Sequence, residues 1–268
     1  MTRRLSFSKW HGLGNDYLLV ERAEAGSPLD VALVRRLCDY HLGIGSDGVL
    51  EIVTVNGARA EIVIWNPDGS QAEMSGNGTR IAARWLARRA AASDVRIAVG
   101  SREVVARVRD GLEVETDIGR VEVGPSETLE VDDTQLEFTP VSVGNPHAVI
   151  VREPDRAELL RIGPLVENHP RFPERTNVQL IRVDSDREVT AAVWERGAGE
   201  TLSSGTSACA VAAASVANGW CESPVTVHLA GGDLLVDLDQ QLHARLTGPA
   251  QEICRGEVSE ELLADLAS

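Results

Sequence analysis

An internal repeat constrains the fold of this chain more than any other feature of its sequence. Like residues recur at a constant offset of 129 in the 268-residue chain: Val49 with Val178, Trp65 with Trp194, Ser75 with Ser204 and Gly76 with Gly205. With one residue of slippage, Gly14-Asn15 also matches Gly144-Asn145. A single offset that carries both a tryptophan and a Ser-Gly turn indicates that one structural unit is duplicated.

The same order of expected elements occurs in both halves. Hydrophobic periodicity predicts strands at 5–20 (interrupted by a turn), 49–53, 59–65, 141–151, 176–183 and 189–196, β-like stretches at 95–125 and 224–247, and helices at 29–41, 79–92, 155–167, 206–218 and 259–266. We expect an α+β fold of two pseudo-symmetric halves. Each half is predicted to be a mostly antiparallel sheet wrapped around a central helix, with a cleft between the halves.

The expected domains are residues 1–128, onto which the C-terminal tail can return, and residues 129–268. Residues 126–137 are acidic and lack a strong pattern, so we predict a connection between the halves there.

Composition excludes several classes of protein. The net charge of −15 has the wrong sign for a nucleic-acid binder or a basic membrane-surface protein. No apolar run approaches the roughly 18 residues of a membrane span, and the N-terminus lacks the apolar region of a signal peptide. We therefore expect a cytoplasmic protein that acts on a small molecule, with neither nucleic acid nor membrane as its partner.

No cofactor or metal is expected. Lys9 is the only lysine, and it has no phosphate-binding loop beside it, whereas pyridoxal-phosphate chemistry requires a Schiff-base lysine. The six histidines form no ligand pair at helical spacing, and the four cysteines lack CxxC spacing. Reduced thiols are the expected state of the cysteines.

The two Ser-Gly turns are the candidate catalytic site. Each precedes an alanine-rich helical stretch, where backbone N–H groups and the helix dipole favour an anion such as a carboxylate. Facing each other, Ser75 and Ser204 would flank one carbon, as inversion of a stereocentre requires. The alternative is that both serines are ordinary helix N-caps.

Eight ordered motifs carry a family resemblance over essentially the whole chain. They are HGLGNDY at 11–17, GIGSDG at 43–48, NPDGS at 66–70, SGNGTR at 75–80, GNPH at 144–147, TNV at 176–178, WERG at 194–197 and SGT at 204–206. Together they resemble diaminopimelate epimerase, a cofactor-independent racemase of bacterial lysine and cell-wall synthesis. Members of that family often dimerise, so a homodimer is a further expectation.

The resemblance also implies roles for individual residues. Substrate polar groups would be bound by Asn15, Asn66, Asn145 and Asn177. The α-carboxylate would be held by the backbone of Gly76, Asn77, Gly205 and Thr206. Glu195 and Arg196 would recognise the distal amino-acid end, since arginine suits a bidentate grip on a carboxylate, and His147 would support the site. The alternative for Glu195-Arg196 is a surface ion pair of little energetic worth.

The chain departs from the family at the acid and base, which in the family are two cysteines and here are Ser75 and Ser204. A thiol ionises near pH 8.5, within reach of the working range, whereas a hydroxyl without an adjacent base is a weak nucleophile and base. Cys209, five residues beyond Ser204, lies too far along the helix to substitute.

Several interpretations therefore stay open. The chain is an epimerase that interconverts LL- and meso-diaminopimelate, from a natural branch that bears serine or as an engineered Cys→Ser form. Alternatively, it is a catalytically silent amino-acid-binding homologue. A third interpretation is a related isomerase or dehydratase that acts on another amino acid without pyridoxal phosphate.

Overall fold

The computed structural model describes residues 5–109, 111–132 and 134–265, in two compact units. One unit combines Met1–Thr116 with Gly248–Ser268, and the other is Asp117–Thr247. The chain passes from one unit to the other within strand β8 (Glu113–Arg120) and returns within β18 (His243–Pro249). The last strand of the chain therefore belongs to the first unit.

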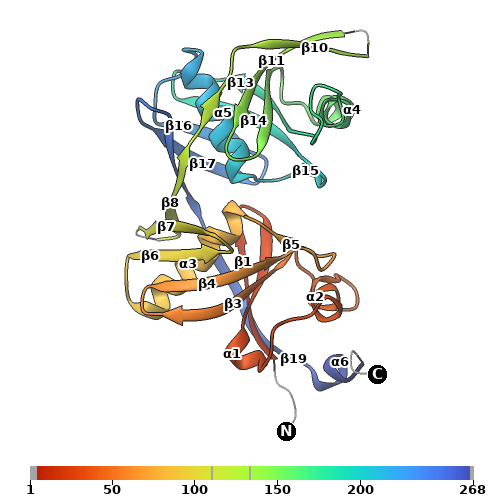
Figure 1. Ribbon diagram of the computed structural model, residues 1–268, viewed down its shortest axis with the longest axis vertical. Helices are drawn as coiled ribbons and strands as arrows, with labels where there is room; N and C mark the ends of the chain where they lie inside the picture. The colour runs from red at the N-terminus through yellow and green to blue at the C-terminus, as the bar shows by residue number, and fades with distance from the viewer. Residues whose placement is uncertain (1–4, 110, 133, 266–268) are drawn as a thin grey trace. The chain divides into compact units, whose positions relative to one another are not determined.

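The first unit is a mixed sheet (Figure 1). Its strands are β1 (Leu5–Gly12), β2 (Asn15–Glu21), β3 (Val49–Asn56), β4 (Arg59–Trp65), β5 (Gln71–Ala72), β6 (Asp94–Val99), β7 (Arg102–Val108), the first part of β8, and β19 (Gln251–Val258). They pair in the order β19-β1-β2-β3-β4-β6-β7-β8, and β5 pairs with β4. Only β2–β3 and β4–β6 are parallel pairs, so the sheet is mostly antiparallel.

The second unit repeats this pattern. Its strands are β9 (Glu122–Val123), β10 (Glu127–Val131), β11 (Thr134–Ser142), β12 (Pro146–Val151), β13 (Asn177–Val183), β14 (Glu188–Glu195), β15 (Gly199–Thr201), β16 (Val225–Leu229), β17 (Gly232–Leu238) and most of β18. The order is β10-β11-β12-β13-β14-β16-β17-β18, with β15 on β14. The parallel pairs, β12–β13 and β14–β16, correspond to those of the first unit.

Strand register confirms the duplication residue by residue. Val49 lies opposite Trp65 in β3–β4, and Val178 lies opposite Trp194 in β13–β14. The parallel pairs agree as well, because Leu18 is opposite Val49 and Ala148 is opposite Val178. Side chains alternate between the faces of a strand, so this shared register places equivalent residues on equivalent faces of the two sheets.

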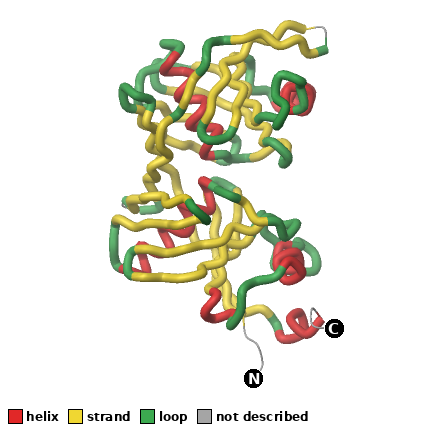
Figure 2. Tube along the Cα trace, viewed as in Figure 1, coloured by secondary structure: helices red, strands yellow, loops and turns green. Residues whose placement is uncertain are grey.

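In each unit the sheet packs around a central helix. Helix α3 (Gly76–Ala90) buries Ile81 and Leu86 among strands of the first unit, with Ala82 and Ala83 allowing close approach. Helix α5 (Gly205–Ala217) is buried from Ser207 to Ser215, because its alanines and small polar residues offer apolar surface on every side. Figure 2 shows both helices enclosed by the strands of their own unit. The predicted architecture of a sheet around a helix is thus confirmed in each half.

The other helices lie outside the two central ones. They are α1 (Arg22–Ala25), α2 (Val31–Cys38), α4 (Arg156–Glu167) and α6 (Glu260–Asp265). Asp30 caps α2 and Asp155 caps α4, each by accepting from the amide three residues on. The predicted tail helix is present, although its expected end at Leu266 lies outside the described residues.

The prediction for residues 126–137 was wrong, because β10 and the start of β11 pair there as a hairpin. Leu129, Val131, Leu136 and Phe138 are buried at alternating positions, while the acidic residues between them face outward. That alternation is the signature of a half-buried strand. The high density of acidic residues obscured it in the sequence.

Candidate active site

The two serines begin the two central helices in the same conformation. Ser75 is the N-cap of α3 with φ −142° and ψ 119°, and Ser204 is the N-cap of α5 with φ −139° and ψ 119°. Each hydroxyl accepts from the amide three residues on, Gly78 at 3.0 Å and Ser207 at 3.4 Å. Both serines are therefore helix caps. Their remaining hydrogen bonds differ.

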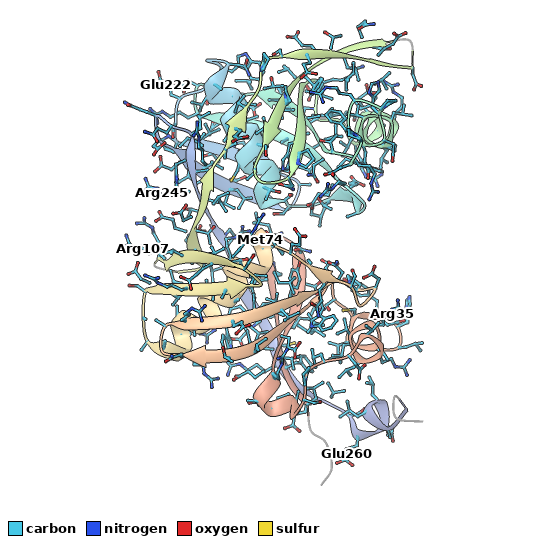
Figure 3. The ribbon with its side chains drawn as sticks, viewed as in Figure 1. Arg35, Met74, Arg107, Glu222, Arg245 and Glu260 are labelled. Carbon is cyan, nitrogen blue, oxygen red and sulfur yellow. The ribbon has the colours of Figure 1, made fainter. Side chains whose placement is uncertain are left out.

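Ser75 lies beside a tyrosine. The hydroxyl of Tyr17, on β2, is 3.0 Å from Ser75 Oγ, and either oxygen can donate in this pair. Tyr17 is 7% exposed, so its phenol is held within the unit. Met74, which precedes Ser75, is labelled in Figure 3. We call Ser75, Tyr17 and Gly78 the first serine cluster.

Beside the first serine cluster, a chain of polar side chains fixes two predicted substrate-binding residues. Arg80, fully buried on α3, donates from Nη2 to Asn77 Oδ1 at 2.5 Å. Asn77 donates in turn to Asn15 Oδ1 at 3.1 Å, and Asn15 donates to Asp47 Oδ2 at 3.0 Å. The structure thus brings Asn15 and Asn77 together. The side-chain amide of each is oriented by two hydrogen-bond partners.

Asn66 is in a separate hydrogen-bonded turn. Its Nδ2 donates to Ser70 Oγ at 2.9 Å, and its backbone N–H donates to the carbonyl of Ser70 at 2.8 Å. These bonds close the Asn-Pro-Asp-Gly turn that follows β4. Among the described residues, no hydrogen bond joins the Asn66 side chain to Asn15 or Asn77.

Ser204 lies beside a half-buried carboxylate. Its hydroxyl donates to Glu195 Oε2 at 3.1 Å, and Ser204 itself is 4% exposed. Burial raises the pKa of Glu195 above its ordinary value, although its hydrogen bond to Ser204 acts the other way. A carboxylate with a raised pKa is a stronger base. We call Ser204, Glu195 and Ser207 the second serine cluster.

His147 is a neutral, fully enclosed imidazole. Burial, with a smaller contribution from the nearby Arg196 charge, lowers the pKa of His147 to about 3. Gln179 Nε2 donates to its Nδ1 at 3.1 Å and also to Ser207 Oγ at 3.0 Å. His147 Nε2–H consequently donates to Asn145 Oδ1 at 3.1 Å. The histidine thereby orients Asn145.

Glu167, on α4, holds the turn after β14 in place by hydrogen bonds. One carboxylate oxygen accepts from Trp194 Nε1 at 2.7 Å, and the other accepts from the backbone N–H of Gly197 at 2.9 Å. Within the same turn, Arg196 N–H donates to Asn177 Oδ1 at 3.0 Å, and Arg196 Nη1 donates to the carbonyl of Glu174. The Arg196 side chain is exposed. Asn177 and Arg196 are therefore brought together as predicted site neighbours.

The remaining predicted residues head the two helices. Gly76 and Asn77 are the first two residues of α3, and Gly205 and Thr206 are the first two of α5. In each helix the serine caps the third amide, so the first two amides precede the capped one at the positive end of the helix dipole. This arrangement suits an anion.

The described residues include no helix with the length and apolar character needed to cross a membrane. Within the same described ranges, no three His, Cys, Asp or Glu side chains are grouped so that they could hold a metal ion.

Solved structures place the fold in a known class. A predicted epimerase from Pseudomonas aeruginosa superposes with a TM-score of 0.71 at 19% identity, over 95% of this chain and 99% of that one. A hydroxyproline epimerase from Agrobacterium vitis gives 0.71 at 16% identity, over 96% and 92%. The duplicated sheet around two capped helices is therefore a fold that these epimerases share.

Sequence comparison narrows the class to one family. The diaminopimelate epimerase family model matches residues 7–124 and 139–253. Diaminopimelate epimerase from Pelotomaculum thermopropionicum is 41% identical over 94% of this chain and 98% of its own length, and that from Desulfitobacterium hafniense is 38% identical over 96% and 99%. The chain belongs to the diaminopimelate epimerase family, which is a family of isomerases.

Several residues that contact the predicted ones were not expected from the sequence. Tyr17, Arg80 and Gln179 each hydrogen-bond to a predicted site residue. One signal for Tyr17 was present, since it lies 130 residues before His147, at the offset of the matched Asn15 and Asn145. The other two are polar residues inside predicted helix or strand stretches, which a pattern of apolar residues does not reveal.

Proposed function

We propose that this protein interconverts LL- and meso-diaminopimelate by moving a proton at the α-carbon, without a cofactor, in the synthesis of lysine and peptidoglycan. The cytoplasm is the proposed location, and a homodimer is the proposed assembly. Family membership supports the substrate. The observation that carries the reaction is the hydrogen bond from Ser204 to the half-buried Glu195 carboxylate.

That hydrogen bond answers the chemical objection to serine. A hydroxyl becomes an effective base only when a neighbouring group takes its proton. Glu195 accepts the Ser204 proton at 3.1 Å, and burial raises the pKa of Glu195 toward the working range. As Ser204 Oγ takes the α-proton of the substrate, its own proton passes to Glu195. The electron pair of the C–H bond then stays on the α-carbon.

Stabilisation of that carbanion requires the adjacent carboxylate to carry charge. We propose that the first amides of the two central helices, from Gly76, Asn77, Gly205 and Thr206, bind this carboxylate, since helix N-termini favour anions. In many enzymes, hydrogen-bond donors placed where negative charge develops contribute the largest share of the rate enhancement. Ser75 then delivers a proton to the opposite face of the same carbon, which inverts it.

The rest of the substrate is proposed to be bound by the four asparagines and Arg196. Asn15 and Asn145 are each oriented by a hydrogen-bonded partner, Asp47 and His147 respectively. Arg196 is exposed and suits the distal carboxylate. In this proposal Glu195 serves as the base for Ser204 rather than as a binder of the distal end, because its carboxylate accepts the hydrogen bond of the serine.

A second function remains a candidate because both serine hydroxyls act as helix caps, which requires no catalysis. In that case the protein binds an amino acid without turning it over. The test is incubation with LL- or meso-diaminopimelate in D₂O, with α-deuterium and inversion followed by NMR. A Ser75→Cys/Ser204→Cys variant is run beside the parent.

Exchange in the parent is the expected result and supports the serine route. Exchange in the double variant alone would overturn that route and leave the scaffold competent only with thiols. Binding without exchange in either protein would favour the silent homologue. Loss of water from another amino acid, detected in the same spectra, would favour a dehydratase.

A further inference from the structure

The duplication places unlike residues at matched positions around the two serines. Tyr17 on β2 occupies the place of His147 on β12, because each precedes a residue with the same parallel partner, Leu18 with Val49 and Ala148 with Val178. Yet only Tyr17 hydrogen-bonds to the serine of its own unit. His147 hydrogen-bonds to Asn145 and Gln179 instead.

The second serine receives its partner from a different matched position. Glu195 follows Trp194 as Asn66 follows Trp65, but Glu195 accepts from Ser204 whereas Asn66 donates to Ser70. Each serine therefore has one ionisable partner, a phenol in the first serine cluster and a carboxylate in the second. Sequence duplication alone would have given both serines the same kind of partner.

Packing holds the phenol in place. Tyr17 lies opposite Trp10 in the antiparallel pair β1–β2, and its backbone is fixed in a central part of the sheet. A Cβ on Gly48 would lie 2.7 Å from Tyr17 Cε1, so only glycine at that position leaves room for the ring. The ring position is thus built into the unit, and it sets the 3.0 Å contact with Ser75 Oγ.

The Tyr17–Ser75 contact allows either oxygen to donate, and with Tyr17 as the donor the two serines have opposite polarity. Ser75 Oγ accepts from Gly78 N–H, and with Tyr17 O–H donating, both lone pairs of the serine are occupied. The hydroxyl hydrogen of Ser75 is then the group that it can give away. Ser204 is the reverse, since its hydrogen is directed to Glu195. Ser75 is arranged as an acid and Ser204 as a base.

We propose that Tyr17 is a further catalytic residue, the proton donor that reloads Ser75; this rests on the proposed epimerase function. Ser75 gives its O–H proton to the carbanion and takes the Tyr17 O–H proton through the 3.0 Å contact. Glu195 ends protonated and Tyr17 ends as phenolate, so the protons balance. Proton exchange with solvent then deprotonates Glu195 and protonates Tyr17 again. The reverse reaction starts from the form in which Glu195 is protonated and Tyr17 is a phenolate.

Tyr17→Phe tests this role, because it keeps the ring and removes the hydroxyl. Both directions should lose kcat/KM by the same factor, about 10²-fold, since the equilibrium constant is unchanged. A second readout is specific to a lost donor. In D₂O, carbanions formed by Ser204 return to the starting isomer more often, so unconverted substrate gains α-deuterium relative to product.

Tyr40→Phe is the matched control, since Tyr17 and Tyr40 are the only tyrosines and Tyr40 is 64% exposed. It should keep the rate and the deuterium ratio of the parent. In the Tyr40→Phe variant, incorporation of 3-fluorotyrosine in place of tyrosine changes Tyr17 alone and makes its phenol more acidic. The rate profile should move to lower pH, which tests the role even if Tyr17→Phe folds poorly.

The outcomes are distinct. A parent that exchanges while Tyr17→Phe matches it in rate and deuterium ratio overturns the role of Tyr17 and leaves the epimerase function standing. A slow Tyr17→Phe with an unchanged deuterium ratio also overturns it, because only packing was lost. A parent without exchange overturns both proposals together.

Discussion

At the scale of single residues, Glu195 is where chemistry and stability make opposite demands. Its carboxylate is half-buried and accepts a hydrogen bond from Ser204. Glu195→Gln keeps the shape and removes the basic group, so we expect epimerisation to fall by about 10²-fold or more. The α-deuterium assay measures the loss, and calorimetric titration with diaminopimelate should show binding close to that of the parent. Loss of binding together with rate would instead assign Glu195 to substrate recognition.

The raised pKa of Glu195 also gives a prediction about stability and pH. Because the folded pKa lies above the unfolded one, the stability associated with this group is fully present below the unfolded pKa and is lost as pH rises through the folded pKa. At pH 7, above the unfolded pKa, the parent therefore bears a cost for this half-buried ionisable group that a neutral glutamine does not bear. We expect Glu195→Gln to melt higher than the parent at pH 7, with the difference shrinking on acidification. A difference in melting temperature that is constant with pH would contradict this.

At the same scale, some residues that were expected at the site contact one another, whereas the partner of Ser75 was not expected. Asn15 and Asn77, and likewise Asn177 and Arg196, were expected at the site and are joined by hydrogen bonds. The phenol beside Ser75 was not foreseen. A turn motif constrains its own backbone, whereas the partner of Ser75 comes from a strand 58 residues away. Strand register decides that contact, and local sequence does not encode register.

At the scale of elements, α4 packs closely against β14 because a glycine of the helix, which has no side chain, lies at the contact. Gly163 faces the ring of Trp194, and an added Cβ would lie 2.8 Å from Cγ and Cδ2. A helical Gly→Ala change ordinarily stabilises by about 0.8–1.0 kcal/mol, but overpacking costs about 1–3 kcal/mol. We expect Gly163→Ala to be destabilising in urea unfolding. It should also slow turnover, because Trp194 and Glu167 fix the turn that follows Glu195.

The control is Ala157→Gly on the exposed side of the same helix. It reports the backbone effect alone and, because Ala157 lies in the first turn of α4, should cost less than about 1 kcal/mol without changing turnover. If Gly163→Ala stabilises the protein, Trp194 has moved freely and the fit of α4 to β14 is looser than its geometry indicates.

Elements with strong periodicity were predictable and acidic strands were not. Helix α2 falls inside the expected 29–41, since its apolar positions recur at helical spacing. The hairpin of β10 and β11 was missed because acidic side chains on its outer face hide four buried apolar ones. β19 was also missed; five of its eight residues are exposed, so it shows little alternation, and only its pairing with β1 makes it a strand.

At the scale of the whole molecule, the duplication predicted more of the fold than any other feature, but it did not predict how the two halves differ. It gave two sheets with the same order of antiparallel and parallel pairs, down to Trp65 and Trp194 in equivalent register. It could not show that the two halves had diverged around their serines. A constant offset reports residues that stayed alike, whereas Tyr17 and Glu195 differ from their counterparts His147 and Asn66. The proposed division into acid and base depends on those differences.

The overall charge gives a last prediction. With 41 acidic and 26 basic residues, the folded chain carries a net charge of −15, whose self-repulsion destabilises the compact state. Exposed pairs such as Arg107–Asp94 oppose this, but each contributes only about 0–1 kcal/mol. Raising KCl shortens the screening length from about 30 Å at 0.01 M to about 3 Å at 1 M. Repulsion acts over longer distances than the pairs do, so the melting temperature should rise with salt.

Charge removal provides the control for that rise. Glu130 and Glu137 are exposed on the hairpin of β10 and β11, so converting both to glutamine leaves the core intact and lowers the magnitude of the net negative charge by two. This variant should melt higher than the parent at 0.01 M KCl and approach it at 1 M, because screening has then removed the repulsion that the substitutions relieve. A melting temperature that falls with salt in both proteins would mean that the exposed ion pairs outweigh the net charge. The many arginine–carboxylate pairs would then be a major source of stability for this family member, and replacing Arg107 should weaken it measurably at low salt.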